Sequence, residues 1–294
     1  MTGKLLATTT YDGVVSLYKI NMKNTVPIFI AEVKRQNPKP AWCVRWADPR
    51  FNQIFAVAYY DQSVVVYQLL EDKKVNTLYS CDMNSSVNKL DFAPWGFGLK
   101  LVAVNSEGGG VLIYRDNTKF EKIEFNCHDE MATCVSWAPA CTLDHFLDPK
   151  SKKTAKVMFA TGGCDKKIRV WEYSKSTNST GVNIIKHLDI DAHESYIRDI
   201  SWSNNGYNNN LTLASGGEDK VLKIWRIEYK DGGYKAECVW KKEFDSPIWK
   251  VSFNYSGNLL AVAYTNSQDI NTVEIYAEKE KNKWEQISQT KNPN

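Results

Sequence analysis

Hydrophobic and polar residues alternate along this chain in short runs that are separated by turn-forming residues. The clearest run is Ile197–Trp202, whose alternation predicts a strand with one apolar face. Residues 211–215 and 221–225 predict two further strands, and Gly-Gly-Glu-Asp at 216–219 predicts a tight turn between them. Residues 234–244 predict a fourth strand, so this region indicates one four-stranded sheet.

The same order of strands recurs along the chain. Predicted innermost, second and third strands lie at residues 42–46, 54–58 and 64–67; 87–92, 99–104 and 111–114; 133–137, 157–161 and 168–171; and 248–253, 258–263 and 272–276. The N-terminal stretch predicts only a second, a third and a fourth strand, at residues 4–9, 14–18 and 25–33. Each third strand contains an aromatic residue, and these follow one another at intervals of 47 to 57 residues: Tyr18, Tyr67, Tyr114, Trp171, Trp225 and Tyr276. Four strands at such a period predict a β-propeller with one blade per repeat.

Two repeats carry a matched set of polar residues. The sets are His193, Ser215, Asp219 and Trp225 in blade five, and His128, Thr161, Asp165 and Trp171 in blade four. In both, the hydroxyl residue precedes the Asp by four positions and the Asp precedes the Trp by six, which is the pattern of a WD repeat. We expect a buried hydrogen-bond chain from Asp through His and the hydroxyl to the indole N–H.

The chain as a whole is predicted to be all-β. We expect a single six-bladed open WD-repeat β-propeller over residues 1–294, with blades at about 1–34, 41–82, 86–127, 132–189, 196–245 and 247–289. Propellers commonly close by letting an N-terminal strand complete the last blade, whereas here blade six ends with its own outer strand at 282–288. Blades one and six are therefore expected to keep open edges, which favour strand addition from another chain.

The order of these motifs resembles one family, the Sec-thirteen propellers of the COPII vesicle coat and the nuclear pore. The telling stretches are Cys134-Val-Ser-Trp-Ala-Pro-Ala140, Phe159-Ala-Thr-Gly-Gly-Cys-Asp165, Ile197–Trp202 and Ile248–Phe253, with a long excursion at 141–156. The resemblance implies a propeller that is completed by a partner-donated blade. In the family one further strand, the innermost of blade one, precedes the others; either the sequence is short at this end or the partner compensates.

The resemblance also implies partners and a location. The partners would be a helical coat rod protein of the Sec-thirty-one type, a helical nucleoporin of the Y-shaped complex and a nutrient-signalling complex. The location would be cytoplasmic, peripheral on endoplasmic reticulum and COPII vesicle membranes, and at the nuclear pore. Candidates for the partner gap are apolar residues of blades one and six: Leu5, Leu6, Val14, Val15, Leu17, Leu259, Leu260, Val273 and Ile275.

Composition narrows the chemistry further. A net charge of +3 is too small to indicate a nucleic-acid surface, and no apolar run has the roughly 18 residues of a membrane span. Seven cysteines, an odd count without framework spacing, favour a reducing compartment. The cysteines and histidines at 127, 128, 134, 141 and 145 lack paired zinc-ligand spacing, so we expect no metal and no cofactor.

Catalysis is not expected. Ser215, His193 and Asp219 imitate a catalytic triad, but the repeat pattern predicts that they are buried, while a nucleophile must be exposed. Three functions are weighed: a scaffold subunit of the vesicle coat and nuclear pore, a peptide-reading WD-repeat adaptor in ubiquitin or chromatin complexes, and, least favoured, an enzyme.

Overall fold

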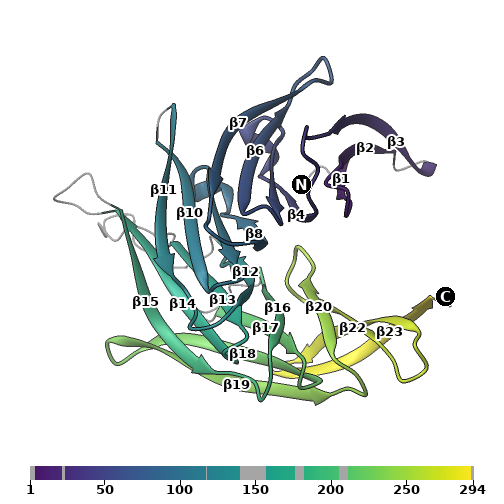
Figure 1. The fold of residues 1–294 in the computed structure, drawn as a ribbon. Helices are drawn as coiled ribbons and strands as arrows, with labels where there is room; N and C mark the ends of the chain where they lie inside the picture. The colour runs from purple at the N-terminus through teal and green to yellow at the C-terminus, as the bar shows by residue number, and fades with distance from the viewer. Residues whose placement is uncertain are drawn as a thin grey trace. The chain divides into compact units, whose positions relative to one another are not determined.

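The structure is a computed structural model that describes residues 4–21, 24–116, 118–139, 157–175, 182–204 and 211–292. In these residues the regular elements are β-strands and two 3-10 helices, η1 (Pro49–Phe51) and η2 (Trp95–Phe97). The strands form six antiparallel sheets, as predicted for the blades of a six-bladed β-propeller (Figure 1). The chain divides into two compact units, residues 1–132 and 133–294, with three sheets in each.

The first unit holds blades one to three. Blade one is three-stranded, in the order β1 (Leu5–Thr9), β2 (Val15–Asn21) and β3 (Asn24–Val33). Blade two contains β4 (Ala41–Trp46), β5 (Ile54–Tyr59), β6 (Ser63–Leu69) and β7 (Val75–Asp82). Blade three contains β8 (Val87–Phe92), β9 (Lys100–Asn105), β10 (Gly109–Asp116) and β11 (Lys119–Asn126).

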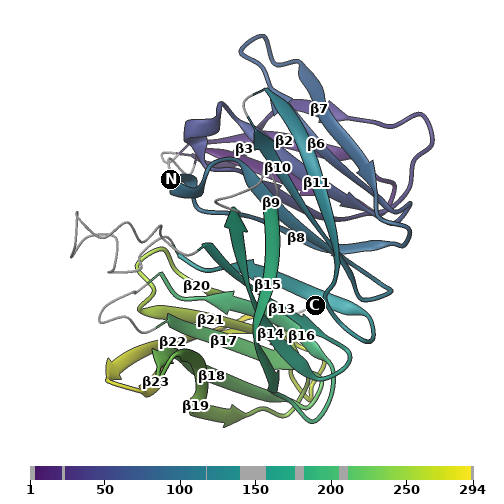
Figure 2. The same ribbon diagram turned by 90° about the vertical axis from the view of Figure 1, so that its left-hand side faces the viewer.

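The second unit holds blades four to six, whose strands other than β12 are labelled in Figure 2. Blade four contains β12 (Ala132–Trp137), β13 (Val157–Gly163), β14 (Lys167–Lys175) and β15 (Val182–Asp191). Blade five contains β16 (Ile197–Trp202), β17 (Leu211–Gly217), β18 (Val221–Lys230) and β19 (Gly233–Glu243). Blade six contains β20 (Ile248–Phe253), β21 (Leu259–Thr265), β22 (Asn271–Glu280) and β23 (Lys283–Asn292).

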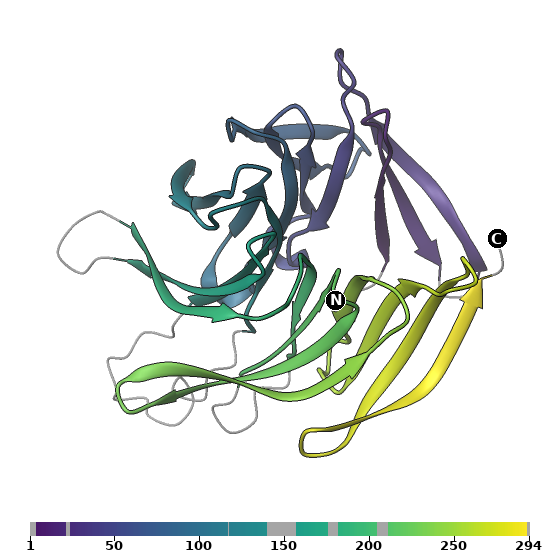
Figure 3. The same cartoon turned by 60° about the horizontal axis from the view of Figure 1, so that its bottom comes forward.

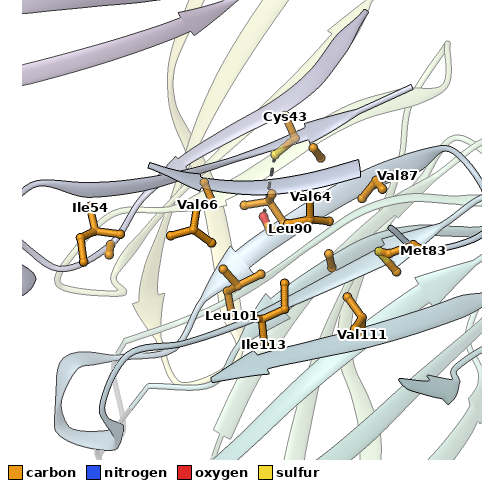
Figure 4. Packing of buried hydrophobic residues seen from close by; sticks show 14 of the residues in the cluster. Cys43, Ile54, Val64, Val66, Met83, Val87, Leu90, Leu101, Val111 and Ile113 are labelled. Carbon is orange, nitrogen blue, oxygen red and sulfur yellow. Dashed lines mark hydrogen bonds between the residues drawn. The ribbon is translucent and has the colours of Figure 1, made fainter. Parts of the chain in front are cut away.

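The core lies between neighbouring sheets. Every residue of β5 is buried, because that strand has a packed layer on each of its two faces. Between blades two and three, small and branched side chains interdigitate, among them Val64, Leu90 and Ile113 (Figure 4). The Cys43 thiol in this cluster lies 3.8 Å from the backbone oxygen of Leu90 and so links the two innermost strands.

The tight turn predicted at residues 216–219 has to be corrected at its two glycines. Gly216 and Gly217 belong to β17, and the residue with a left-handed backbone in the following turn is Lys220 (φ 65°). A Cβ on Gly216 would lie 2.5 Å from Ile248 Cγ2, so this glycine permits close packing of blade six on blade five. Gly216 is therefore needed for close packing between two sheets. The sequence alone does not distinguish such a glycine from one that forms a turn.

The third strands are longer than predicted. The sequence predicted residues 221–225 and 272–276, whereas β18 and β22 each continue for several residues along their fourth strands. These extensions are polar and exposed at the solvent end, as in the last residues of β22. Apolar periodicity therefore marks only the part of each strand that lies in the core.

Candidate functional site

The polar set of blade five forms one continuous hydrogen-bond chain. His193 Nδ1 lies 2.9 Å and 3.0 Å from the two carboxylate oxygens of Asp219, and His193 Nε2 lies 2.7 Å from Ser215 Oγ. The indole N–H of Trp225 donates to the same Ser215 Oγ at 2.9 Å. With Nδ1 donating to Asp219, Nε2 accepts from the Ser215 hydroxyl, so each polar atom of the chain is paired.

The carboxylate of Asp219 anchors the turn before β18. Burial alone would raise its pKa, but the hydrogen bond from His193 and the backbone N–H groups of Glu194 and Val221 outweigh burial and hold the pKa below its usual value. Ser215 is fully buried, so this group has no access to a substrate. Its role is to fix the loop between blades, and it does not have the exposed nucleophile of a catalytic triad.

Blade four shows the corresponding bond on its own third strand. Trp171 Nε1 donates to Thr161 Oγ1 at 2.9 Å, and the backbone N–H of Lys167 donates to Asp165 at 3.3 Å. Asp165 also pairs with Arg169, whose side chain is almost wholly buried. His128 is buried and lies in the first of the two compact units.

Other blades replace the set with groups that the sequence pattern does not reveal. In blade six, Glu274 is buried and accepts hydrogen bonds from the hydroxyls of Tyr264 (2.8 Å) and Tyr276, and from Gln289 (3.1 Å). In blade three, Asn105 accepts from the backbone of Gly109 at 2.7 Å and donates to the Met83 oxygen at 2.8 Å. A search for the His–Ser–Asp–Trp spacing misses these sets because different residue types supply the same donors and acceptors.

Blade one presents an apolar face that is not covered by blade two. Along β1, Leu5 and Ala7 pack toward the core between blades one and two, while Leu6 points to the opposite face and is 37% exposed. The strand register places Leu6 opposite Tyr18 and Tyr18 opposite Phe29. The rings of Tyr18 and Phe29 meet edge to face at 5.9 Å, and Phe29 is 54% exposed. We call Leu6, Tyr18 and Phe29 the blade-one face.

Blade six presents a comparable face in the other unit. Residues along β21 alternate between buried and half-buried, in contrast to the almost entirely buried β17. The half-buried side includes Ala261 opposite Ile275 and Ala263 opposite Val273, beside Leu259. We call Leu259, Ala261, Ala263, Val273 and Ile275 the blade-six face, whose long strands β22 and β23 are yellow in Figure 3. A groove of about 450 Å³ opens at its end, lined by Trp249, Ala263, Tyr264, Thr265, Asn271, Thr272, Val273 and Thr290.

The predicted gap residues divide into two groups. Leu6, Val14, Leu259, Val273 and Ile275 are at least partly accessible to solvent. The other candidates lie in the cores between blades, where Val15, Leu17 and Leu260 are fully buried and Leu5 packs against the same core as the first two. These four side chains face the cores between blades, since alternation along a strand sends every second apolar side chain to the other face, and their assignment to the gap stays a prediction.

The described residues give no support to a metal site at the cysteines and histidines considered in the sequence analysis. Within the described ranges, no group of three or more His, Cys, Asp or Glu is placed to hold a metal ion, and Cys134 is fully buried in β12. Residues 141 and 145, and the whole excursion at 141–156, lie outside the described residues. Among the described residues, no helix has the length and apolarity to cross a bilayer.

Comparisons with known proteins agree with the fold. The family model "WD domain, G-beta repeat" matches residues 120–172 and 184–226. A "Protein transport protein sec13" of Emericella nidulans is 28% identical over 97% of this chain and 91% of its own length. A "Protein transport protein SEC13" of Yarrowia lipolytica is 29% identical over 96% of this chain and 91% of its own length. A "Protein SEC13 homolog" of Drosophila melanogaster is 28% identical over 97% of this chain and 78% of its own length. The resemblance drawn from the sequence is therefore confirmed.

Proposed function

We propose that this chain, a WD-repeat propeller of the Sec13 family, is a scaffold subunit of a COPII-type vesicle coat that carries protein from the endoplasmic reticulum to the Golgi. The observation that carries the proposal is the similarity to protein transport proteins over nearly the full length of the chain. A scaffold needs rigid sheets and outward surfaces, and the polar sets and accessible apolar faces of this chain fit that requirement.

The finer form of the proposal concerns the partner. A helical rod protein of the Sec-thirty-one type would donate a blade whose two sides pack on the blade-one face and the blade-six face. Side chains such as Leu6, Phe29 and Val273 are apolar and at least a third exposed, which supports a partner that buries them. A helical nucleoporin of the Y-shaped complex, or a nutrient-signalling complex, would use the same two faces.

Affinity purification from the native cell tests this proposal directly. We expect a stoichiometric partner with a long helical rod, and we expect the substitutions Leu6→Asp and Val273→Asp to abolish its recovery. Both residues are exposed, so the aspartates should leave the fold intact, whereas an aspartate at the fully buried Val15 would unfold it. The matched control is Ile185→Asp on β15, at 43% exposure, which should leave recovery unchanged. Unchanged recovery with the two face variants would contradict the proposal.

A second candidate function, a peptide-reading adaptor, is favoured by one surface. Tyr11, Trp42 and Tyr60 form an exposed aromatic cluster in the first unit, in which Trp42 meets Tyr11 at 6.3 Å and Tyr60 at 6.2 Å between ring centroids. Several recognition domains use exposed aromatic side chains to bind Pro-rich extended peptides. Recovery of a ubiquitin-ligase or histone-modifying subunit, lost on Trp42→Ala and without any rod protein, would place this function first.

A further inference from the structure

Four of the innermost strands share an irregularity at their second residue. In β4, β8, β16 and β20 the pairing with the second strand skips that position, which holds Trp42, Asn88, Arg198 and Trp249. Such a β-bulge leaves the extra residue unpaired in the ladder and re-aims its side chain. Trp42 and Trp249 are accordingly 49% and 51% exposed. The bulge position therefore presents a side chain for contacts outside its own sheet.

In the second unit, a tryptophan at this position already holds a cation. The guanidinium carbon of Arg198 stands 3.9 Å from the ring centroid of Trp249. The same guanidinium pairs with the Glu218 carboxylate at 2.5 Å, so a ring and a carboxylate hold it together. Glu218 follows β17, and its N–H donates at 2.8 Å to the backbone oxygen just ahead of β16.

Blade two places aromatic residues where blade five has this ion pair. Trp42 occupies the bulge position of β4, as Arg198 does in β16. Tyr60 occupies the position of Glu218, because it follows β5 and its N–H donates at 2.8 Å to the backbone oxygen just ahead of β4. The cation and its carboxylate in blade five are thus replaced by two exposed rings in blade two.

The spacing within the aromatic cluster suits a cation between its rings. The Trp42 centroid lies 6.3 Å from that of Tyr11 and 6.2 Å from that of Tyr60, at interplanar angles of 71° and 76°. Three guanidinium groups of this chain stand 3.9 to 4.5 Å from a ring centroid. A cation at such distances from two perpendicular rings needs their centroids about 5.5–6.4 Å apart. Both pairs of rings fall within this range.

The polar groups around the cluster select the kind of cation. A guanidinium or a primary ammonium brings N–H donors that need acceptors when water is displaced. Glu218 supplies that acceptor in blade five, whereas its counterpart Tyr60 supplies a ring. The carboxylate of Asp61, next in the chain, is already bound by Arg35 at 2.8 Å and by the Ser63 hydroxyl at 2.6 Å. A trimethylammonium has no N–H donor, so the rings can hold it without a carboxylate.

The residues beside the rings favour a peptide over a lipid headgroup. Thr10 and Asp12 flank Tyr11, and Asp61 follows Tyr60. A surface that enters a bilayer needs apolar neighbours around its aromatic residues, and anionic headgroups repel carboxylates. The trimethylammonium is therefore expected on a side chain in water.

We propose that the aromatic cluster of Tyr11, Trp42 and Tyr60 binds a trimethylated lysine side chain in a peptide of a second protein. This inference rests on the second candidate function above, the peptide-reading adaptor, and names the residue that such a module would read. The two can fail separately, because a peptide without methylated lysine can still bind at Trp42.

The probe is the capped pentapeptide Ala-Ala-Lys-Ala-Ala with trimethylated lysine, titrated into the purified full chain. The indole N–H of Trp42, which donates to Ser86 Oγ at 3.3 Å, reports binding through its NMR resonance. We expect a saturable shift, and about fivefold weaker binding when a neutral tert-butyl group replaces the trimethylammonium. Peptides with unmodified lysine or with arginine should also bind about fivefold more weakly.

Three variants locate the site, with binding followed by saturation transfer to the methyl protons of the peptide. Trp42→Ala should abolish binding, whereas Trp95→Ala, at a tryptophan 46% exposed in the same unit, should leave it unchanged. Tyr60→Glu introduces the acceptor that Glu218 supplies in blade five. It should reverse the preference, so that the arginine peptide binds more tightly than the trimethyl-lysine peptide.

Several outcomes would overturn the proposal. Equal binding of the charged and the tert-butyl peptides would do so, as would binding that survives Trp42→Ala. A proline-rich peptide that binds at Trp42 more tightly than the trimethyl-lysine peptide would keep the peptide-reading function and overturn this inference alone. Phosphatidylcholine vesicles that bind through Trp42, while the peptide does not, would assign the rings to a headgroup instead.

Discussion

Ser215 shows how one hydroxyl can hold a blade together. It joins His193 to Trp225 in a site with no access to water, and both neighbours lose a partner if it is removed. Ser215→Ala should therefore lower the free energy of unfolding by about 2 kcal/mol, because two buried polar groups are left unpaired. Urea denaturation measures this, with Thr212→Ala on the same strand as a control that should change it by less than about 0.5 kcal/mol. If the Ser215→Ala protein has the same free energy of unfolding as the control, the chain of hydrogen bonds contributes little to stability.

Single residues were predicted well where the spacing is fixed by a shared set of contacts. Ser215 and Trp225 could be found from sequence because the turn and the register leave one spacing for their bond. Glu274 could not, since its tyrosine partners substitute for the Trp and hydroxyl of the usual set. The environment of Trp46 was equally hidden, because only the structure shows that its indole N–H is buried and has no partner among the described residues.

At the scale of the element, β3 combines exposure with a protected edge. Its residues 26–31 carry no charge, and Val26, Ile28 and Phe29 are each more than half exposed. An uncharged apolar edge strand is a template for pairing with a second copy, and Pro27 is the residue that blocks it by lacking an N–H. The exposed side chains of β3 can therefore contact a partner, while Pro27 prevents another strand from pairing with the backbone at this edge.

Replacement of this proline tests the argument. Pro27→Val restores an outward N–H within the apolar run, so we expect concentration-dependent oligomers in size-exclusion chromatography and a higher rate of aggregation. Thr77→Val on β7, the outer strand of blade two, adds the same exposed side chain without a new N–H and should remain like the parent protein. If both variants stay equally monodisperse, the backbone of Pro27 does not protect this edge.

Strands themselves were predictable to within a few residues at their inner ends. The innermost strands at residues 87–92, 197–202 and 248–253 were predicted with the bounds that β8, β16 and β20 show. The outer strands were less defined, because a strand such as β23 has mostly exposed residues beyond its buried Trp284. The hydrophobic pattern indicates which residues are buried, so it does not predict the part of a strand that is exposed.

At the scale of the whole molecule, the repeat period sets six sheets, and tyrosines are buried in several of them. Burial raises the pKa of Tyr59 and Tyr67 in the first unit and of Tyr276 in the second, and burial together with the nearby Glu274 carboxylate raises the pKa of Tyr264 to about 12. The ordinary value is 10.0. In the unfolded chain these hydroxyls ionise near that ordinary value, while in the folded chain they stay protonated to higher pH.

The molecule should therefore lose stability in alkali. A folded-state pKa above the unfolded one gives stability that is complete below about pH 10 and declines as the pH rises through 12. The free energy of unfolding, measured in urea across this range, should fall steadily as the unfolded state releases more protons than the folded one. Tyr264→Phe should flatten the decline, and Tyr255→Phe, at a side chain 76% exposed, should not. A decline of the same slope in both variants would mean that the buried hydroxyl of Tyr264 is not what links the fold to pH.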